Sequence, residues 1–469
     1  MKKTLSFFTS TKGIPQDDAR LTINLYPEKI SDTVMTARAC PGSEVVFDQD
    51  RFGGGRAGIS AQERIFAIQG AFLTEQVNGT SITRGVLDAV DGDISLISNG
   101  FQLLIVNTAH GYVFKLADNS FVILPPESGF QGGNGIAAYC GGRGVCQQLD
   151  GTFPPKFQCS DQYDFTNWNG VAFQAAQSLS EITGMIGIAD WLYIFSGNSY
   201  EGWQDQGYPI FPYRRVVWGD NAGIESHRSA QAFQGSIFWL AKGQEGNRNI
   251  FMATVGSRAT SISDAAISRL IDQIADPSDA IGLFYQALNS WFYIITFVSG
   301  NLTLAYDLGT GMWHRRAWRD PSTGQYIPVP YITIFENAGD VYCVDYRNGQ
   351  IHRQSEDLYQ NSGDPIRFEG VLQTWPPESS MLSFCKGVEL FAEMSNAPVN
   401  APAASFMLRC SPDRGKTYGP EIWRSSGDTG SYAQRVYWQG LGSSYTWTFW
   451  IAIVANQYIS FRGVEVELT

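Results

Sequence analysis

The stretch "SWFYIITFVSGNLTLAYDL", residues 290–308, contains two apolar runs joined by a tight turn. The run from Trp291 to Phe297 is almost continuously apolar and aromatic, which is typical of a strand that packs on both faces. Four other segments have the same design, so each is predicted to be a β-hairpin. They are "FQLLIVNTAHGYVFKL" from Phe101, "DWLYIFSGNSYEGW" from Asp190, "GSIFWLAKGQEGNRNIFMA" from Gly235 and "GDVYCVDYRNGQIHRQ" from Gly339.

The spacing of these hairpins indicates a repeating architecture. Their starts lie 89, 45, 55 and 49 residues apart, so the first interval spans about two units. A period of about 45 to 55 residues fits four-stranded propeller blades. With a further unit around "ERIFAIQGAFL" (63–73), the sequence predicts a mostly β chain with a β-propeller-like domain of about six blades over residues 46–363. In the last hairpin, Asn348-Gly349 predicts a type I′ turn with positive φ at both positions.

One segment of the repeat region has helical rather than strand periodicity. "SISDAAISRLIDQIAD" (261–276) places Ile267, Leu270, Ile271 and Ile274 on one helical face, with Ser263 as the expected N-cap. We expect one amphipathic helix packed on or between blades. A helix that binds a partner is the less favoured alternative.

The two ends of the chain differ from the repeats. Residues 364–469 contain six or seven separate strand candidates at the spacing of a β-sandwich, so they are predicted to form a C-terminal β-sandwich domain. Residues 1–45 contain Pro15, Pro27 and Pro41 and are predicted to be an extended N-terminal docking arm, which needs a partner to become ordered.

Composition limits the classes of function. The formal net charge is −12, which argues against a protein that grips nucleic acid by neutralising phosphates. No stretch approaches the roughly 20 apolar residues needed to cross a bilayer, so no membrane insertion is expected. The apolar run after Lys2 and Lys3 is too short for a signal peptide. The seven cysteines are odd in number and scattered, which favours free thiols made in a reducing cytoplasm.

The segment "CSPDRGKTYGPEIW", residues 410–423, resembles the Asp-box of sialidases. Its pattern consists of Ser411, Asp413, Gly415, Thr417 and Tyr418. A sialidase-type site also needs an arginine cluster, a Tyr–Glu nucleophile pair, an acid and usually several boxes, whereas this box lies outside the repeats. We therefore interpret it as a structural turn motif, in which Asp413 bonds nearby backbone, Gly415 takes a positive φ and Tyr418 plugs the sheet.

Other motifs give weaker signals of chemistry. Cys140 and Cys146 in "CGGRGVC" have the spacing of a metal or disulfide pair, but no second pair accompanies them, so a glycine-rich loop tip is favoured. His314, in "GMWHRRAWRD", has Trp313, Arg315, Arg316 and Trp318 close by in sequence. Such a cluster can stack on a base or a sugar, although a cation–π contact at a blade edge is more common. No catalytic residue, metal site or cofactor is predicted.

Four stretches, taken in order, resemble the tail-hub or nozzle proteins of short-tailed bacteriophages, also called packaged-DNA stabilization or head-completion proteins. The stretches are "INLYPEKI" with "ACPG"; "FQCSDQYDFTNW" with "ITGMIGIADWLYIFSGNSYEGWQDQG"; "YPIFPYRRV" with "AGIESHRS"; and "SPDRGKTYGPEIW", "QRVYWQGLG" and "FRGVEVEL". Each stretch alone is weakly specific, but the ordered set spans nearly the whole chain. The glycine-rich region 130–150 departs from the resemblance as an insertion at a blade tip.

The resemblance implies a non-enzymatic structural protein of the virion tail, made in the host bacterial cytoplasm. Such a protein forms a homo-oligomeric, six-fold ring below the portal and its adaptor ring. The ring continues the DNA channel, helps retain packaged DNA before ejection, and seats a distal needle or plug, tailspikes or fibres. In this reading the arm docks through Asn24, Tyr26, Pro27, Pro41 and Gly42. An acidic surface fits a conduit that contacts passing DNA only weakly. The alternative is a sialidase-like or lectin-like carbohydrate-active β-propeller.

Overall fold

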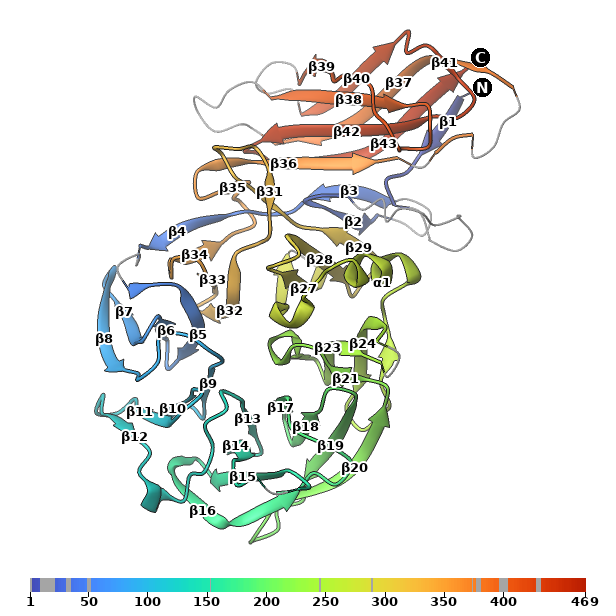
Figure 1. Ribbon diagram of the computed structural model, residues 1–469. Helices are drawn as coiled ribbons and strands as arrows, with labels where there is room; N and C mark the ends of the chain where they lie inside the picture. The colour runs from blue at the N-terminus through green and yellow to red at the C-terminus, as the bar shows by residue number, and fades with distance from the viewer. Residues whose placement is uncertain are drawn as a thin grey trace.

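The computed structural model describes residues 2–8, 22–30, 35–48, 52–151, 153–243, 246–287, 290–372, 374–376, 381–395, 404–426 and 432–469. The chain is mostly β and consists of a propeller and a sandwich, which lie at opposite ends of the molecule (Figure 1). Among the described residues, no helix has the length and apolar character needed to cross a membrane.

Within the described ranges, six blades of the propeller are separate antiparallel sheets. The first blade consists of β5 (Gly55–Ala61), β6 (Arg64–Gln69), β7 (Phe72–Val77) and β8 (Thr80–Val86), and the second of β9 (Ser95–Ser98), β10 (Gln102–Val106), β11 (Gly111–Lys115) and β12 (Phe121–Ile123). The third consists of β13 (Ala137–Cys140), β14 (Arg143–Gln148), β15 (Lys156–Asp161) and β16 (Asp164–Ala175), and the fourth of β17 (Gly184–Ile188), β18 (Trp191–Phe195), β19 (Ser199–Asp205) and β20 (Tyr213–Asp220). The fifth consists of β21 (Gly223–Ile224), β22 (Gln231–Phe233), β23 (Ser236–Lys242), β24 (Arg248–Thr254) and β25 (Thr260–Ser261), and the sixth of β26 (Ile281–Ala287), β27 (Ser290–Phe297), β28 (Leu302–Asp307) and β29 (Trp313–Arg315).

A further blade completes the ring and joins the two ends of the chain. It consists of β32 (Tyr331–Asn337), β33 (Asp340–Asp345) and β34 (Ile351–Gln354), with β4 (Ser43–Phe47) paired to the outer side of β34. Strand β32 packs beside β5 of the first blade and beside β26 of the sixth. An N-terminal strand therefore closes the propeller, and the closing blade continues into the second sheet of the sandwich.

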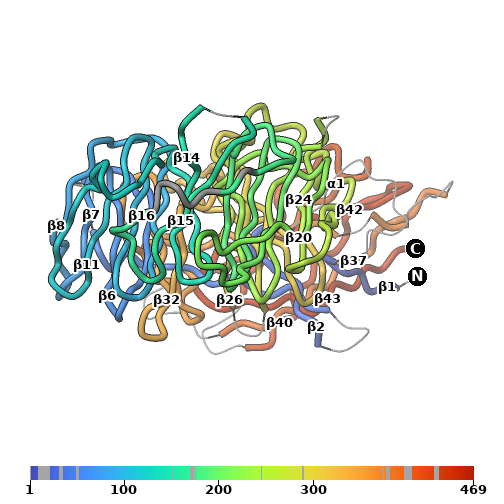
Figure 2. Tube along the Cα trace, turned by 90° about the horizontal axis from the view of Figure 1, so that it is seen from below, coloured from blue at the N-terminus to red at the C-terminus, as the bar shows by residue number. Residues whose placement is uncertain are grey.

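The sandwich is built from both ends of the chain. One sheet has the order β2 (Leu25–Lys29), β3 (Met35–Ala39), β43 (Ile459–Leu468), β37 (Ser383–Met394) and β40 (Ala433–Gln439), with β1 (Lys2–Leu5) beside β43 and β41 (Ser443–Ser444) beside β37. The other contains β35 (Gln360–Asn361), β36 (Asp364–Val371), β42 (Thr448–Ala455), β38 (Ser405–Ser411) and β39 (Ile422–Ser425). Because β1 pairs with β43, the two termini lie side by side (Figures 1 and 2).

Apolar layers between neighbouring sheets hold the fold together. Buried clusters lie between each successive pair of blades, including the closing blade and the first, where Ile65 and Ala67 meet Val344 and Ile351. A separate core fills the sandwich. The N-terminal strands contribute Leu5, Leu25 and Ala37 to that core, so the sandwich depends on them for burial of apolar surface.

The predicted propeller and C-terminal sandwich are confirmed. The five predicted hairpins are β10–β11, β18–β19, β23–β24, β27–β28 and β33–β34, which are the second and third strands of their blades. These strands have a neighbour on each side and a blade on each face, which explains their continuous apolar runs. The long first interval between hairpins contains the blade β13–β16.

Two local predictions need correction. At the β33–β34 turn Gly349 has φ 76°, but Asn348 is outside the left-handed region. The turn is longer than a type I′ pair, because Gly349 N donates to Asp345 O and Asp345 N donates to Gln350 O. The helix α1 (Ala265–Asp272) is capped by Asp264 instead of Ser263: the Asp264 carboxylate accepts hydrogen bonds from Ala266 N and Ile267 N.

Candidate functional site at the propeller–sandwich junction

The N-terminal residues 22–24 lie as a short extra strand between the propeller and the sandwich. Ile23 forms β-bridges with Arg315 of β29 on one side and with Glu369 of β36 on the other. Ile23 N donates to Glu369 O, and Asn24 N donates to Arg315 O, both at 2.9 Å. One strand therefore uses both of its backbone edges to tie the sixth blade to the sandwich.

Asn24 strengthens this connection with its side chain. Its Nδ2 donates to Ala317 O and to Arg367 O, each at 2.9 Å, and its Oδ1 accepts from Ala317 N at 2.9 Å. Asn24 has φ 59°, a left-handed conformation that asparagine tolerates better than most residues. The side chain is buried and makes three hydrogen bonds, two with Ala317 and one with Arg367, so it acts as a clamp between the two domains.

The other four predicted docking residues lie in the same region. The Tyr26 ring packs edge-on against Phe292 of β27, with the ring centroids 5.2 Å apart. Pro27 pairs with Ala37 in the β2–β3 hairpin. Pro41 O accepts a hydrogen bond from Arg316, and Gly42 N donates to Leu358 O.

The prediction that residues 1–45 form an arm without a partner of its own is wrong for the described part of that segment. The segment is ordered by pairing with β43, β36 and β34 of the same chain. Its strands are short, and the backbone hydrogen bonds by which they pair with distant strands leave little mark on the sequence. Pro15 lies outside the described residues.

A polar network beside the clamp was not predicted from sequence. Glu369 accepts hydrogen bonds from Tyr326 Oη at 2.5 Å and Trp450 Nε1 at 3.0 Å, and it pairs with Arg367. The Arg367 guanidinium lies 5.3 Å from the centre of the Trp450 ring. These residues come from β31 (Tyr326–Ile327), β36 and β42, so only the tertiary structure brings them together.

The predicted turn-motif residues lie at the end of β38, which contains Ser411, and in the loop that leads to β39. Asp413 accepts hydrogen bonds from Ser411 Oγ at 2.7 Å, Thr417 N at 2.8 Å and Thr417 Oγ1 at 2.5 Å. The hydrogen bonds from Thr417 and Ser411 hold the pKa of Asp413 well below its usual value. Gly415 has φ 88°, and its N–H donates to Ser411 Oγ. The half-buried Tyr418 lies 5.5 Å below the Arg409 guanidinium and does not enter the core.

The cluster around His314 is built into the core and offers no stacking surface. His314 is 1 % exposed and packs against Tyr26 and Phe292. Burial holds its pKa well below the usual value, so the imidazole is neutral at pH 7. Arg316 lies 4.9 Å from the centre of the buried Tyr285 ring. The cation–π alternative therefore describes this cluster.

The cysteines show no sign of metal or disulfide chemistry. All seven are free thiols, and Cys140 and Cys146 are buried on β13 and β14. Burial raises the pKa of each of these two thiols to about 12. Across the part of the chain that the structure describes, no group of three or more His, Cys, Asp or Glu residues could hold a metal ion.

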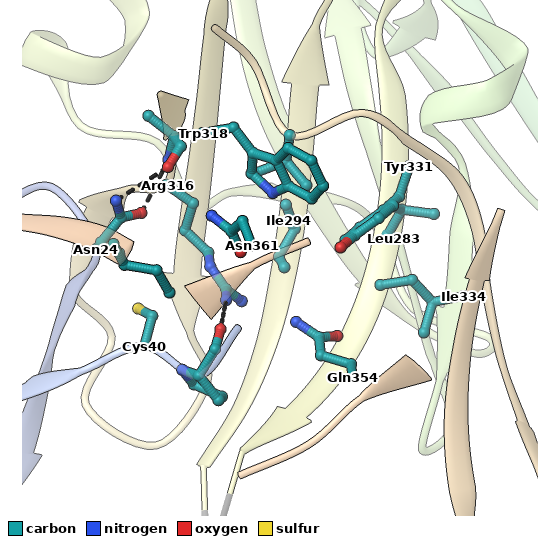
Figure 3. Close-up of a pocket in the computed structure, with 14 residues that line it drawn as sticks. Asn24, Cys40, Leu283, Ile294, Arg316, Trp318, Tyr331, Ile334, Gln354 and Asn361 are labelled. Atoms are coloured by element: carbon teal, nitrogen blue, oxygen red, sulfur yellow. Dashed lines mark hydrogen bonds between the residues drawn. The ribbon is translucent and has the colours of Figure 1, made fainter. Parts of the chain in front are cut away.

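A small cavity of about 20 Å³ opens beside the Asn24 clamp (Figure 3). It lies where the N-terminal segment, the last two blades and the start of the sandwich meet. The lining residues are Asn24, Cys40, Pro41, Leu283, Ile294, Arg316, Ala317, Trp318, Val329, Tyr331, Ile334, Gln354, Asn361 and Ile366. A space of this size holds about one water-sized species, which is far too small for a sugar.

Comparison with solved structures gives remote similarities only. The extracellular domain of BT4673 from B. thetaiotaomicron has 9 % identity and a TM-score of 0.45, covering 71 % of this chain and 45 % of that one. The N-terminal domain of Nup159 has 10 % identity and a TM-score of 0.41, covering 73 % and 97 % of the two chains. BamB from Moraxella catarrhalis has 10 % identity and a TM-score of 0.36, covering 76 % and 98 %. The chain thus spans less than half the length of the first of these structures.

The family comparison concerns the C-terminal domain. Residues 373–469 match the family described as the β-sandwich of bacteriophage P22 Gp10. No curated protein matches the chain. The matched residues include β37 to β43, the greater part of the sandwich described above. The match concerns this domain alone and does not extend to the propeller.

Proposed function

We propose that the protein is a non-enzymatic structural component of a short-tailed phage, forming a tail hub or nozzle ring below the portal and its adaptor. The ring is a homo-oligomer, expected to be six-fold, that continues the DNA channel and helps retain packaged DNA before ejection. The observation that carries the proposal is the match of residues 373–469 to the P22 Gp10 β-sandwich. The distal partners are a needle or plug, tailspikes or fibres.

The construction of the chain supports a load-bearing role. The propeller is closed by β4, and the sandwich is completed by β1, β2 and β3, so the N-terminal segment crosses both domains. Opening either domain requires breaking strand pairs that are distant in sequence. Such closed β-structures have few exposed backbone hydrogen bonds through which local unfolding can begin. The acidic net charge fits a surface past which DNA moves without strong phosphate contacts.

The carbohydrate-active alternative has less support. The Asp413 carboxylate is occupied by Ser411 and Thr417 within its own loop. Two of the arginines that such a cluster would require have separate partners: Arg215 pairs with Glu201 on β19, whereas Arg316 donates to Pro41 O. A sialidase-like protein requires arginines that converge on one substrate carboxylate.

The test is to locate the protein in particles of the source phage. An affinity tag at the C-terminus is labelled with gold and viewed by electron microscopy, with a tagged major capsid protein as the control for label access. Gold at the tail below the head vertex is the expected result. Gold confined to peripheral fibres, or particles that lack the protein while the capsid control is labelled, would contradict the proposal.

A further inference from the structure

Arg316 is a buried cation without an acidic partner. The residue is 7 % exposed. Its Nη2 donates to Pro41 O at 3.1 Å, and its guanidinium lies over the Tyr285 ring. In the described ranges it makes no ion pair with an Asp or Glu, and the groups that act on its charge are cysteines and tyrosines. Since arginine stays protonated in proteins, a full positive charge is buried here.

The neighbouring groups do not neutralise this charge. Burial raises the pKa of Cys40 to about 11, so its thiol carries no charge at neutral pH. Burial also raises the pKa values of Tyr285 and Tyr331 far above neutrality. A carbonyl oxygen and an aromatic face only partly compensate a buried cation, and an uncompensated one is strongly destabilising.

The cavity beside Arg316 is lined by hydrogen-bond donors. Arg316, Asn361 and Gln354 are arranged around the same space (Figure 3). Among the described residues, the side-chain N–H groups of Asn361 and Gln354 have no acceptor, whereas Gln354 Oε1 accepts from Cys343 Sγ at 3.8 Å, so these N–H groups are available to a species in the cavity. The fourteen lining residues include one arginine and no Asp or Glu. The space is therefore positive, with the side chains of Arg316, Asn361 and Gln354 set among mostly apolar neighbours.

We infer that this cavity binds a monovalent anion of halide size, such as chloride. The volume of about 20 Å³ admits a species close to water in size and excludes phosphate or a carboxylate ligand. Arg316 supplies the charge, and the amides of Asn361 and Gln354 supply neutral donors. Because the lining residues come from the N-terminal segment, the propeller and the sandwich, the anion stabilises the junction of all three.

Crystallography of the whole chain with bromide tests the site directly. Crystals grown or soaked in sodium bromide should give an anomalous peak within hydrogen-bond distance of Arg316. The same peak should be present in the matched variant Arg435→Gln, since Arg435 is an exposed arginine whose side chain is 70 % accessible and pairs with Glu389. A water molecule without anomalous signal at this position, in bromide-saturated wild-type crystals, would overturn the inference.

Thermal unfolding provides a second measurement in solution. At constant ionic strength, wild type and Arg435→Gln should melt a few degrees higher in sodium chloride than in sodium gluconate, whose anion is too large for the cavity. Arg316→Gln should lose that chloride-dependent increment. An equal increment in all three proteins would contradict a specific site. If Arg316→Gln does not fold, the bromide experiment on wild type still decides the question, and neither result bears on the proposed place in the tail.

Discussion

Asn24 and Ala317, which are 293 residues apart in sequence, exchange two hydrogen bonds of 2.9 Å, one in each direction. The Asn24 side-chain amide thereby bonds both backbone groups of Ala317, as the backbone of a neighbouring strand would. Its Nδ2 also donates to Arg367 O of the sandwich. This buried amide thus reinforces the backbone bridges of Ile23, which also connect the propeller to the sandwich.

Replacing Asn24 by Ala should lower the free energy of unfolding by about 2–4 kcal/mol, because three buried hydrogen bonds are lost. Urea unfolding followed by tryptophan fluorescence measures the change. Asn78→Ala is the matched control: Asn78 also has a positive φ, at 48°, but lies exposed at the tip of the β7–β8 hairpin. Equal losses in the two variants would show that backbone strain, not the clamp, is responsible.

Replacing Gly42 by Ala should destabilise the closing blade by about 2–3 kcal/mol through overpacking. A Cβ atom at Gly42 would lie 2.1 Å from Gln360 O, a backbone atom that cannot rotate away. Gly463→Ala provides the comparison, because its Cβ would meet only Thr4 at an ordinary 3.7 Å. Calorimetry should show a lower melting temperature for the first variant and little change for the second.

Deleting residues 1–48 should prevent cooperative folding of the propeller and the sandwich together, since it removes β1 to β4. A deletion of residues 1–8 removes only β1 and the adjacent Phe7 contact, so it should weaken the sandwich while leaving the propeller closed. Limited proteolysis and circular dichroism distinguish these outcomes. A longer deletion that melted like wild type would refute the account of ring closure by β4.

Replacing Asp413 by Asn should lower the melting temperature of the sandwich by a few degrees at pH 7. The folded-state pKa of Asp413 is lower than its usual 3.8, so its contribution is present above that value and is lost as the pH falls below it. Calorimetry at pH 7 and pH 3 measures the difference between variant and wild type, which should shrink at the lower pH. An unchanged melting curve at pH 7 would contradict the proposed role of the turn motif.

His352 should make the protein less stable as the medium becomes mildly acidic. Burial lowers the pKa of His352 from 6.5 to about 4. The neighbouring Asp345 acts in the opposite direction, but it also forms an ion pair with Arg347. Between these pH values the unfolded chain binds a proton that the folded chain does not, so folding loses up to about 3 kcal/mol. His352→Gln should therefore show a flatter dependence of the unfolding free energy on pH from 6.5 to 4. A slope equal to that of wild type would refute this assignment. The buried His314 adds the same pH dependence to both proteins, so it does not affect the comparison.

The local sequence predicted the repeating part of the fold well. The run from Trp291 to Phe297 indicates a strand covered on both sides because burial on two faces selects apolar residues continuously. The loop around Asp413 could likewise be interpreted from its own residues, since Asp413 finds its partners within four positions. Details that depend on backbone geometry, such as the cap at Asp264 and the φ of Asn348, could not be predicted from the pattern of residues.

The sequence by itself determined the blades and the strands of the sandwich, because their apolar patterns are local, and within a blade each strand pairs with a near neighbour. Only the tertiary structure decided where residues 22–30 and 35–47 lie, how the ring closes and that Arg316 is buried beside a small cavity. The physical reason is that these features rest on backbone hydrogen bonds and on contacts between residues hundreds of positions apart. Such interactions constrain which segments meet while leaving almost no periodic trace in the residues themselves.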